Sequence, residues 1–370
     1  MRDNTKKKKY LFAAVYSLVV AAFTAYVMLD TFVLERVEQS DAGAQNTSMF
    51  DGLEVKKLSA DTQEQESSSK EESSSENESS PQEQASSWAR RSRHRSSQQT
   101  VDNSTQRQEE SSSQSESEST PVTAGDNESI GSYSDENIAV TINEYYENGT
   151  KIYVADVRLS SAQYLKTAFA NGAYGKNVKA TTSDTADEVG AILAINGDYY
   201  GAREKGYVIR NGIAYRSTAE SDSDILCIYA DGHFDIISPS EATADELVDD
   251  RVWQAFTFGP GLIDNGSITV SRGQEVDQAM ASNPRTAIGQ IDELHYVFVV
   301  SDGRTEESAG LSLYELAQFM QSLGCETAYN LDGGGSSTMY FEGEVINNPT
   351  GGTSSGTSER KVSDIVYLGY

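Results

Sequence analysis

Residues 296–337 read YVFVVSDGRTEESAGLSLYELAQFMQSLGCETAYNLDGGGSS, and this stretch carries the clearest structural signals in the chain. The continuously apolar run 296–300 predicts a strand that is buried on both faces. Ser312 and Glu315 form a capping-box pair, so a helix is expected to begin there and to end at Gly324. The apolar residues of one helix face are Leu313, Leu316, Ala317, Met320 and Leu323. A second strand follows, and the order strand, helix, strand predicts a parallel crossover.

Tight-turn dipeptides between apolar runs lie on the N-terminal side of this stretch. Asn148-Gly149 is expected to turn residues 138–146 back onto residues 151–158. Asn211-Gly212 and Asp231-Gly232 lie between similar apolar runs and predict two further hairpins.

Two other segments complete the coarse prediction. Residues 191–195 are continuously apolar, which indicates another strand buried on both faces, and a weaker helical pattern covers residues 162–170. Together these patterns predict an α+β fold, a β-rich mixed-sheet domain with few helices.

Composition separates this domain from what precedes it. The chain has 370 residues, with 29 Lys and Arg against 57 Asp and Glu, so its formal net charge is −28. Such an acidic chain is a poor partner for nucleic acid, because phosphate binding needs a basic surface. Two cysteines, Cys227 and Cys325, are too few for a disulfide scaffold or a four-cysteine zinc site, and whether they pair stays open.

The N-terminal region predicts a membrane span. Residues 10–29 carry no charged side chain and are long enough to cross a hydrocarbon core of about 30 Å. Four lysines at positions 6–9 precede this run, so the positive-inside rule places the N-terminus in the cytoplasm and the remainder outside the cell. A cleaved signal peptide is the alternative, but the nearest small-x-small site, at residues 42–44, lies far downstream.

Ser, Glu and Gln crowd residues 59–120, which almost lack aliphatic side chains and therefore predict a disordered stalk. If the flexible stalk comprises the roughly 95 residues between Val33 and Ser129, it has an r.m.s. span of about 50 to 60 Å and would let the domain reach into a cell wall. Its basic island at residues 90–95 is either a contact for an anionic polymer or a solvated charge cluster. The expected segments are a cytoplasmic N-terminus at 1–9, a transmembrane signal anchor at 10–29, a stalk at 30–132 and a folded domain at 133–370.

Four polar, glycine-rich segments lie where predicted strands end, at residues 196–200, 285–289, 301–304 and 330–337. The last is the most informative. Its three glycines, 333–335, stand between Asp332 and two serines, so their amides can point at one anion beside a fixed carboxylate. The alternative for this segment is a glycine-rich bulge or hairpin loop without a ligand.

These segments, in this order and with the predicted helix between the last two, resemble the phosphodiester glycosidase family. The resemblance also includes Asn348-Pro349 and the tail at residues 359–363, and it covers residues 138–370. The family's usual Asn-Gly-Gly-Phe-Phe reads Asn-Gly-Asp-Tyr-Tyr at residues 196–200. Asp198 therefore either prevents a close approach of the backbone to a ligand or adds a carboxylate to the site.

The resemblance implies hydrolysis of a sugar-1-phosphodiester, such as an α-N-acetylglucosamine derivative, at the anomeric carbon. Arg285 would bind the phosphate, and Asp332, with Asp198 as second choice, would be the carboxylate that an oxocarbenium-like transition state needs. Asp302 would orient Arg285 or help to hold a cation. The residues expected to bind substrate are Asn196, Gly197, Tyr199, Asn330, Gly333, Gly334, Gly335, Ser336, Ser337 and Arg360.

Each assignment has a structural alternative. Arg285 and Asp302 would then be an ion pair, Asp332 a loop cap, and Arg360 a surface residue. Asp198, Asp302 and Asp332 together offer oxygen ligands for Ca²⁺ or Mg²⁺, although their spacing matches no standard loop and the metal stays unknown. The chain has only three histidines, which argues against a Ser-His-Asp triad and a histidine-rich zinc site.

The sequence therefore predicts a membrane-anchored extracellular hydrolase that acts on a sugar-phosphate glycan or cell-wall polymer in the cell envelope or an exopolysaccharide. Two alternatives stay open. One is a non-catalytic module that binds phosphate-bearing wall polymers, and the other is a metal-dependent phosphodiesterase or transferase.

Overall fold

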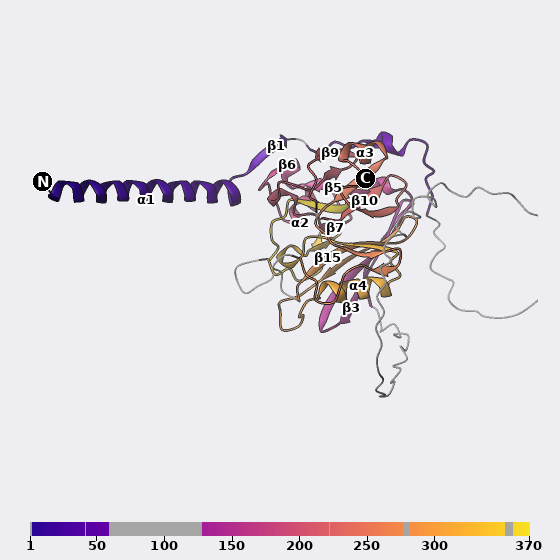
Figure 1. Ribbon diagram of the computed structural model, residues 1–370. Helices are drawn as coiled ribbons and strands as arrows, with labels where there is room; N and C mark the ends of the chain where they lie inside the picture. The colour runs from indigo at the N-terminus through magenta and orange to yellow at the C-terminus, as the bar shows by residue number, and fades with distance from the viewer. Residues whose placement is uncertain (1, 41, 59–127, 222, 277–281, 352–357) are drawn as a thin grey trace, which may run out of the picture. The chain divides into compact units, whose positions relative to one another are not determined.

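The computed structural model describes residues 2–40, 42–58, 128–221, 223–276, 282–351 and 358–370 (Figure 1). The described residues up to 58 and from 128 onward belong to one compact unit. Most of the predicted stalk, with its basic island, lies outside the described residues. The described strands form one sheet of eight strands, two of five and one of two, so the β-rich fold with few helices is confirmed.

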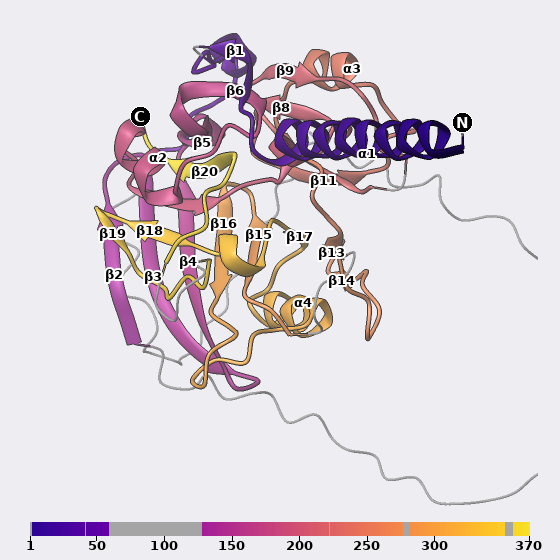
Figure 2. The ribbon, with the colours of Figure 1, turned by 90° about the vertical axis from the view of Figure 1, so that its left-hand side faces the viewer.

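The largest sheet has eight antiparallel strands, which Figure 2 shows largely side by side. Its hairpin at Asn148-Gly149 is confirmed, since both residues have the positive φ that a tight turn needs and the flanking strands pair along their whole length. In sheet order the strands are β14 (Ser267–Ile268), β13 (Gly261–Asp264), β17 (Thr327–Asn330), β15 (Arg285–Asp292), β16 (His295–Ser301), β4 (Thr150–Leu159), β3 (Ile138–Glu147) and β2 (Glu128–Ser134).

The predicted crossover is the unit β16, α4 (Leu313–Ser322) and β17. Ser312 and Glu315 make the reciprocal capping bonds at the start of α4. Both β16 and β17 pair antiparallel with β15, so the two strands run in the same direction with β15 between them. The crossover is therefore confirmed, although its two strands are not neighbours.

A five-stranded sheet contains β19 (Glu344–Val345), β18 (Met339–Phe341), β7 (Leu193–Asn196), β20 (Asp364–Leu368) and β5 (Leu165–Phe169), in this order. The central position of β7 confirms its prediction as a buried strand. The helix expected at residues 162–170 is wrong, because that segment is a short 3-10 turn followed by β5. Pairing with β20 and burial of Leu165 and Phe169 in the core outweigh the weak helical pattern.

The other five-stranded sheet has the order β11 (Phe234–Ile237), β10 (Ile225–Tyr229), β12 (Val252–Phe256), β8 (Val208–Arg210) and β9 (Ile213–Arg216). Its hairpins at Asn211-Gly212 and Asp231-Gly232 are confirmed. Two short helices, α2 (Thr182–Val189) and α3 (Ala244–Asp249), complete the domain.

The core lies between the largest sheet and the sheet that contains β7. One apolar cluster joins Val140 and Val157 of the first sheet to Ile195 and Val366 of the second. On the opposite face of the largest sheet, α4 packs against a separate cluster (Figure 2). Cys227 and Cys325 lie buried in different clusters and are both free thiols, so they do not pair.

The N-terminal helix α1 covers Arg2–Phe32, and its segment Phe12–Thr31 is apolar and long enough to cross a membrane. A signal sequence has the same properties. The next residues depart from the expected stalk at 30–132. Strand β1 (Arg36–Ser40) pairs with β6 (Ala173–Lys176), Met49 is buried against Trp253, and β2 begins at Glu128.

Candidate functional site

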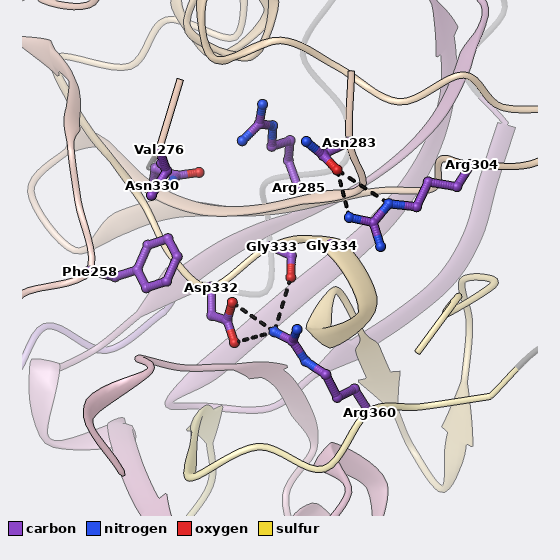
Figure 3. A pocket seen from close by; sticks show the side chains of 10 residues that line it. All are labelled: Phe258, Val276, Asn283, Arg285, Arg304, Asn330, Asp332, Gly333, Gly334 and Arg360. Atoms are coloured by element: carbon purple, nitrogen blue, oxygen red, sulfur yellow. Dashed lines mark hydrogen bonds and ion pairs between the residues drawn. The ribbon is translucent and has the colours of Figure 1, made fainter. Parts of the chain in front are cut away.

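A pocket of about 170 Å³ opens at one edge of the largest sheet (Figure 3). Because β15 runs antiparallel to β16 and β17, the start of β15 and the ends of the other two strands meet at this edge. Three of the glycine-rich segments recognised in the sequence thereby come together. The residues that line the pocket are Phe258, Val276, Asn283, Arg285, Arg304, Asn330, Asp332, Gly333, Gly334 and Arg360.

An ion pair between Asp332 and Arg360 forms one side of the pocket (Figure 3). Nη2 of Arg360 donates to Oδ1 and Oδ2 of Asp332 at 2.9 and 2.7 Å, and Nε donates to Oγ of Ser336 at 2.7 Å. Ser336 in turn donates to Asp332 Oδ2 at 2.7 Å. Burial raises the pKa of Asp332, and the bonds from Arg360 and Ser336 oppose this effect without cancelling it.

Arg304 lies across the pocket from this pair and was not among the predicted site residues. Arg304 follows β16 and belongs to the glycine-rich segment 301–304. That segment was already a candidate in the sequence, so the sequence did contain a signal for this residue. Nε and Nη2 of Arg304 donate to Oδ1 of Asn283 at 3.2 and 2.7 Å, which fixes an otherwise exposed side chain. A Cβ at position 334 would lie 3.0 Å from Arg304 Nη2, so Gly334 leaves room for the guanidinium.

Arg285 is buried at the start of β15, and its partner is Glu275. Nη2 of Arg285 lies 2.5 Å from Glu275 Oε2, and Nε donates to the carbonyl of Leu311 at 2.8 Å. Burial lowers the pKa of Arg285, although Glu275 acts against the shift. No motif in the sequence marked Glu275.

The expected pairing of Asp302 with Arg285 is corrected by this geometry. The carboxylate of Asp302 instead accepts bonds from the amide of Asn348 at 2.8 Å and from the side chains of Asn347 and Asn348 at 3.3 Å. Asp302 therefore holds the chain that follows β19, because a buried carboxylate is costly unless it accepts hydrogen bonds.

Asn330 lines the pocket and contains a buried acceptor without a partner in the described part of the chain. Its Nδ2 donates to the carbonyl of Gly259 at 2.8 Å, whereas its Oδ1 is buried and has no hydrogen-bond partner among the described residues. A buried polar atom without a partner costs about 1–3 kcal/mol, so its position at the pocket wall indicates a ligand or water donor.

The glycine-rich loop uses several of its backbone amides within the protein. The amides of Gly334, Ser336 and Ser337 donate to the carbonyls of Pro284, Gly333 and Gly334. The last two bonds close a 3-10 turn at Gly334–Ser336, and the first ties the loop to the residue before β15. Glycine is needed at Gly333 and Gly335 because a Cβ there would lie within 2.9 Å of neighbouring backbone atoms. These contacts fix the backbone of the loop that carries Asp332.

The segment at residues 196–200 supports the pocket from outside its lining. Nδ2 of Asn196 donates to the carbonyl of Asp332 at 2.6 Å, and its Oδ1 accepts from Thr286 and Thr338. A Cβ at Gly197 would lie 2.6 Å from Asp364 Oδ1, so this glycine serves close packing. Tyr199 is 38% exposed and its ring lies 5.9 Å from the guanidinium carbon of Arg360.

Asp198 belongs to a second, fully buried charge cluster with Arg210 and Asp364. Its Oδ2 lies 3.6 Å from Arg210 Nη2, and Arg210 Nε donates to Asp364 Oδ2 at 2.8 Å. Burial raises the pKa of Asp364 to about 6, although Arg210 lowers it. This cluster joins β7, β8 and β20 and does not line the pocket.

Electrostatics of the pocket favour an anion in spite of the acidic chain. Among the described residues that line the pocket, three are arginines and one is a carboxylate, Asp332, while Glu275 pairs with Arg285, so these five groups together carry one net positive charge. Within the described residues, no group of three or more His, Cys, Asp or Glu side chains is placed to hold a metal ion. Asp198, Asp302 and Asp332 each bind protein donors instead of converging.

Several known proteins are similar to this chain. Residues 189–368 match the family model described as phosphodiester glycosidase. The SPbeta prophage-derived uncharacterized protein YomE of Bacillus subtilis is 28% identical over 204 residues, which are 53% of this chain and 31% of YomE. The N-acetylglucosamine-1-phosphodiester alpha-N-acetylglucosaminidase of Mus musculus is 28% identical over 196 residues, which are 48% of this chain and 37% of the mouse protein.

The chain thus spans about a third of the length of these curated relatives. A solved structure with a similar fold is the catalytic domain of the zebrafish N-acetylglucosamine-1-phosphodiester alpha-N-acetylglucosaminidase, described as auto-inhibited by its pro-peptide. The TM-score is 0.52 at 19% identity, over 66% of this chain and 88% of that domain. The resemblance seen in the sequence motifs is therefore confirmed over residues 189–368, which match the phosphodiester glycosidase family model.

Proposed function

We propose that the pocket hydrolyses the bond between the anomeric carbon and a phosphodiester oxygen of a sugar-1-phosphodiester, with an α-N-acetylglucosamine-like sugar. The observation that carries this proposal is the Asp332–Arg360 pair, which faces two further arginines across the pocket. One carboxylate beside several guanidinium groups suits a substrate that develops positive charge on a sugar and negative charge on a phosphate.

The arginines would act on the phosphate. Cleavage at the anomeric carbon expels a phosphate monoester, which needs stabilisation of its charge more than a strong acid. The bonds within the protein use Nε and Nη2 of Arg285, Arg304 and Arg360. Within the described part of the chain no bond uses their Nη1 groups, which would bind phosphate oxygens, and guanidinium groups stay charged at any working pH.

Asp332 would act on the sugar. An oxocarbenium-like transition state is stabilised by a carboxylate that either attacks the anomeric carbon or activates water. Asp332 is 7% exposed and held by Arg360, Ser336 and the backbone bond to Asn196, so its oxygens have a fixed direction. Because burial raises its pKa, its activity as a carboxylate would decline on acidification at a higher pH than for an ordinary aspartate.

Asn330 would contribute to substrate selection. Its unpartnered Oδ1 accepts a hydrogen bond, so it suits a hydroxyl or an amide N–H of the sugar. A site that is built to accept such a bond discriminates strongly against an analogue without the donor.

The N-terminal segment supports a location for the substrate. The apolar segment Phe12–Thr31 after a run of lysines supports a single-pass anchor with a cytoplasmic N-terminus and an extracellular domain. The substrate would then be a sugar-phosphate glycan or polymer of the cell envelope or an exopolysaccharide.

Isotope labelling tests the reaction. The full chain, in mild detergent, is incubated with an α-N-acetylglucosamine-1-phosphodiester in ¹⁸O-labelled water, and the phosphate product is examined by mass spectrometry. We expect an unlabelled phosphate monoester, because water attacks the sugar carbon. Phosphate is the sharper readout, since the anomeric hydroxyl of a free sugar exchanges with water.

Two results would contradict the proposal. Label in the phosphate would move the reaction to phosphorus and favour a metal-dependent phosphodiesterase or transferase. Saturable binding without any product, lost in Arg304→Gln, would favour the binding module. An Asp332→Asn preparation that is folded and inactive serves as the control for contaminating hydrolases.

A further inference from the structure

Residues 36–40 and 42–58, here called the strap, are bound along the surface of the folded domain. The strap begins with β1, which pairs with β6 from Arg36 opposite Lys176 to Ser40 opposite Ala173. A Cβ at Gly175 would lie 2.1 Å from the carbonyl oxygen of Arg36. Only glycine permits this approach, so the domain has a built place for the strand.

The contact continues upstream to the end of α1. Nδ2 of Asn177 donates to the carbonyls of Thr31 and Leu34 at 3.1 and 3.2 Å. Asn177 is buried and has the left-handed backbone that asparagine tolerates at the end of β6. The domain therefore binds the chain directly after the apolar segment.

The middle of the strap is buried. Ala42 is 4% exposed among Phe169, Tyr174 and Tyr200, and its amide donates to the carbonyl of Gly172 at 2.8 Å. Its carbonyl accepts from the hydroxyl of Tyr215 at 3.1 Å.

A second buried contact follows at Met49. Its side chain is 4% exposed and packs on Trp253, and the ring of Phe50 lies 4.8 Å from that of Trp253 in an edge-on arrangement. The amide of Asn46 donates to the carbonyl of Asn211 at 2.9 Å, at the turn of the β8–β9 hairpin.

The end of the strap contacts the turn between β2 and β3. The amide of Lys56 donates to the carbonyl of Ser160 at 3.0 Å, and that of Leu58 donates to the carbonyl of Glu136 at 3.3 Å. Glu136 lies between β2 and β3, and β2 begins at Glu128. Both chain ends that flank residues 59–127 therefore belong to the same compact unit.

We infer that the strap, and not the Ser/Glu/Gln-rich segment at residues 59–127, joins the domain to the anchor. This inference rests on the proposed role of α1 as a membrane anchor. Five residues from Thr31 to Arg36 span at most about 18 Å, against an r.m.s. reach of about 50 Å for a flexible stalk. The domain then works close to the membrane surface, which favours a sugar-phosphodiester carried there over one deep in a wall.

Cleavage within the segment tests the inference. A protease recognition sequence replaces residues 96–102 of the full chain, which carries an N-terminal affinity tag, and washed membranes are treated with the protease. We expect the C-terminal fragment, which contains residues 128–370, to stay in the membrane pellet without loss. It should co-purify with the tag in mild detergent and separate from the tag in urea. Release of this fragment by cleavage alone would overturn the inference.

Matched glycine variants show whether the strap is the contact that holds the fragment. Gly175→Val places side-chain atoms on the backbone of β1, whereas a Cβ at Gly43 meets nothing within 4 Å. After cleavage, the fragment should be lost from the tag in Gly175→Val and retained in Gly43→Val. If Gly175→Val does not fold, Met49→Asp, which sets a charge against Trp253, provides the same comparison.

Retention in both Gly175→Val and Met49→Asp would overturn the strap as the holding contact. The anchor is tested separately by the uncut protein. If it is absent from the membrane pellet, the proposed localisation fails, while co-purification with the tag still reports on the strap.

Discussion

Two clusters of aspartate and arginine lie in this domain, and they differ in what surrounds them. At the pocket, Arg360 is 42% exposed in its side chain and covers a single carboxylate, Asp332. In the second cluster, Arg210 lies between Asp198 and Asp364, and all three side chains are at most 1% exposed. The first cluster can meet a ligand and the second cannot.

The comparison shows that the same residue types have different roles, depending on whether a ligand can reach them. Cation–π packing of Arg210 on Phe256, at 4.3 Å, and bonds to Ile209 and Ala255 fix the buried guanidinium within the protein. Removal of one partner from such a cluster leaves an uncompensated buried charge. The pocket cluster should therefore govern turnover, and the buried cluster should govern stability.

Asp332→Asn should produce the largest effect. We expect kcat/KM for a sugar-1-phosphodiester to fall by about 10³-fold or more, on the order of 4 kcal/mol, because the carboxylate that stabilises the sugar cation is lost. The free energy of unfolding, measured in urea, should change little by comparison. Full turnover in the folded variant would remove Asp332 from the reaction.

Arg210→Met should lower the free energy of unfolding by about 3–5 kcal/mol, since Asp198 and Asp364 then remain buried without their cation. Urea denaturation measures this loss. The matched control is Arg158→Met, whose arginine is half exposed and lies 3.9 Å from Asp156, so its effect should be close to zero. Equal stability of the two variants would contradict the distinction between the clusters.

The buried cluster should also make stability depend on pH. Burial raises the pKa of Asp364 from its usual value to about 6, with Arg210 opposing, so the folded state binds this proton more tightly than the unfolded state. The stabilisation is present at low pH and is lost as the pH rises through about 6, by up to about 3 kcal/mol. The free energy of unfolding, measured in urea, should fall between pH 4 and pH 7 relative to that of Asp364→Asn. A difference that grows in the opposite direction would contradict the assignment.

The smallest expected effect is that of Arg304→Gln. Loss of one charged hydrogen-bond donor to phosphate should reduce kcat/KM by about 10 to 100-fold, with little change in stability because the side chain is exposed. Arg304→Lys should recover part of the activity, since it keeps the charge without the planar fork. Turnover that is unchanged in both variants would place the phosphate elsewhere in the pocket.

Much of the domain was predictable from local patterns. The hairpins at Asn148-Gly149, Asn211-Gly212 and Asp231-Gly232 follow from residues that accept positive φ, and α4 follows from its capping box. The segments that contribute Arg285, Arg304 and Asp332 were recognisable because glycine and polar residues follow apolar runs.

What escaped prediction depends on contacts between distant parts of the chain. The burial of Asp198 follows from Arg210 and Asp364, which are 12 and 166 residues away in sequence. Glu275 pairs with Arg285, although no sequence motif marks it. Asp302 accepts hydrogen bonds from Asn347 and Asn348 instead of pairing with Arg285. The strap was assigned to the stalk because its few apolar residues gain partners, such as Trp253, only in the folded domain.

The most direct test is a crystal structure of Asp332→Asn with an intact sugar-1-phosphodiester bound. We expect the phosphate to accept hydrogen bonds from Arg304 and Arg360, with the anomeric carbon facing the side chain at position 332 and a sugar donor bonded to Asn330 Oδ1. A ligand that binds with its sugar against the arginines and its phosphate away from them, or outside this pocket, would contradict the proposed reaction.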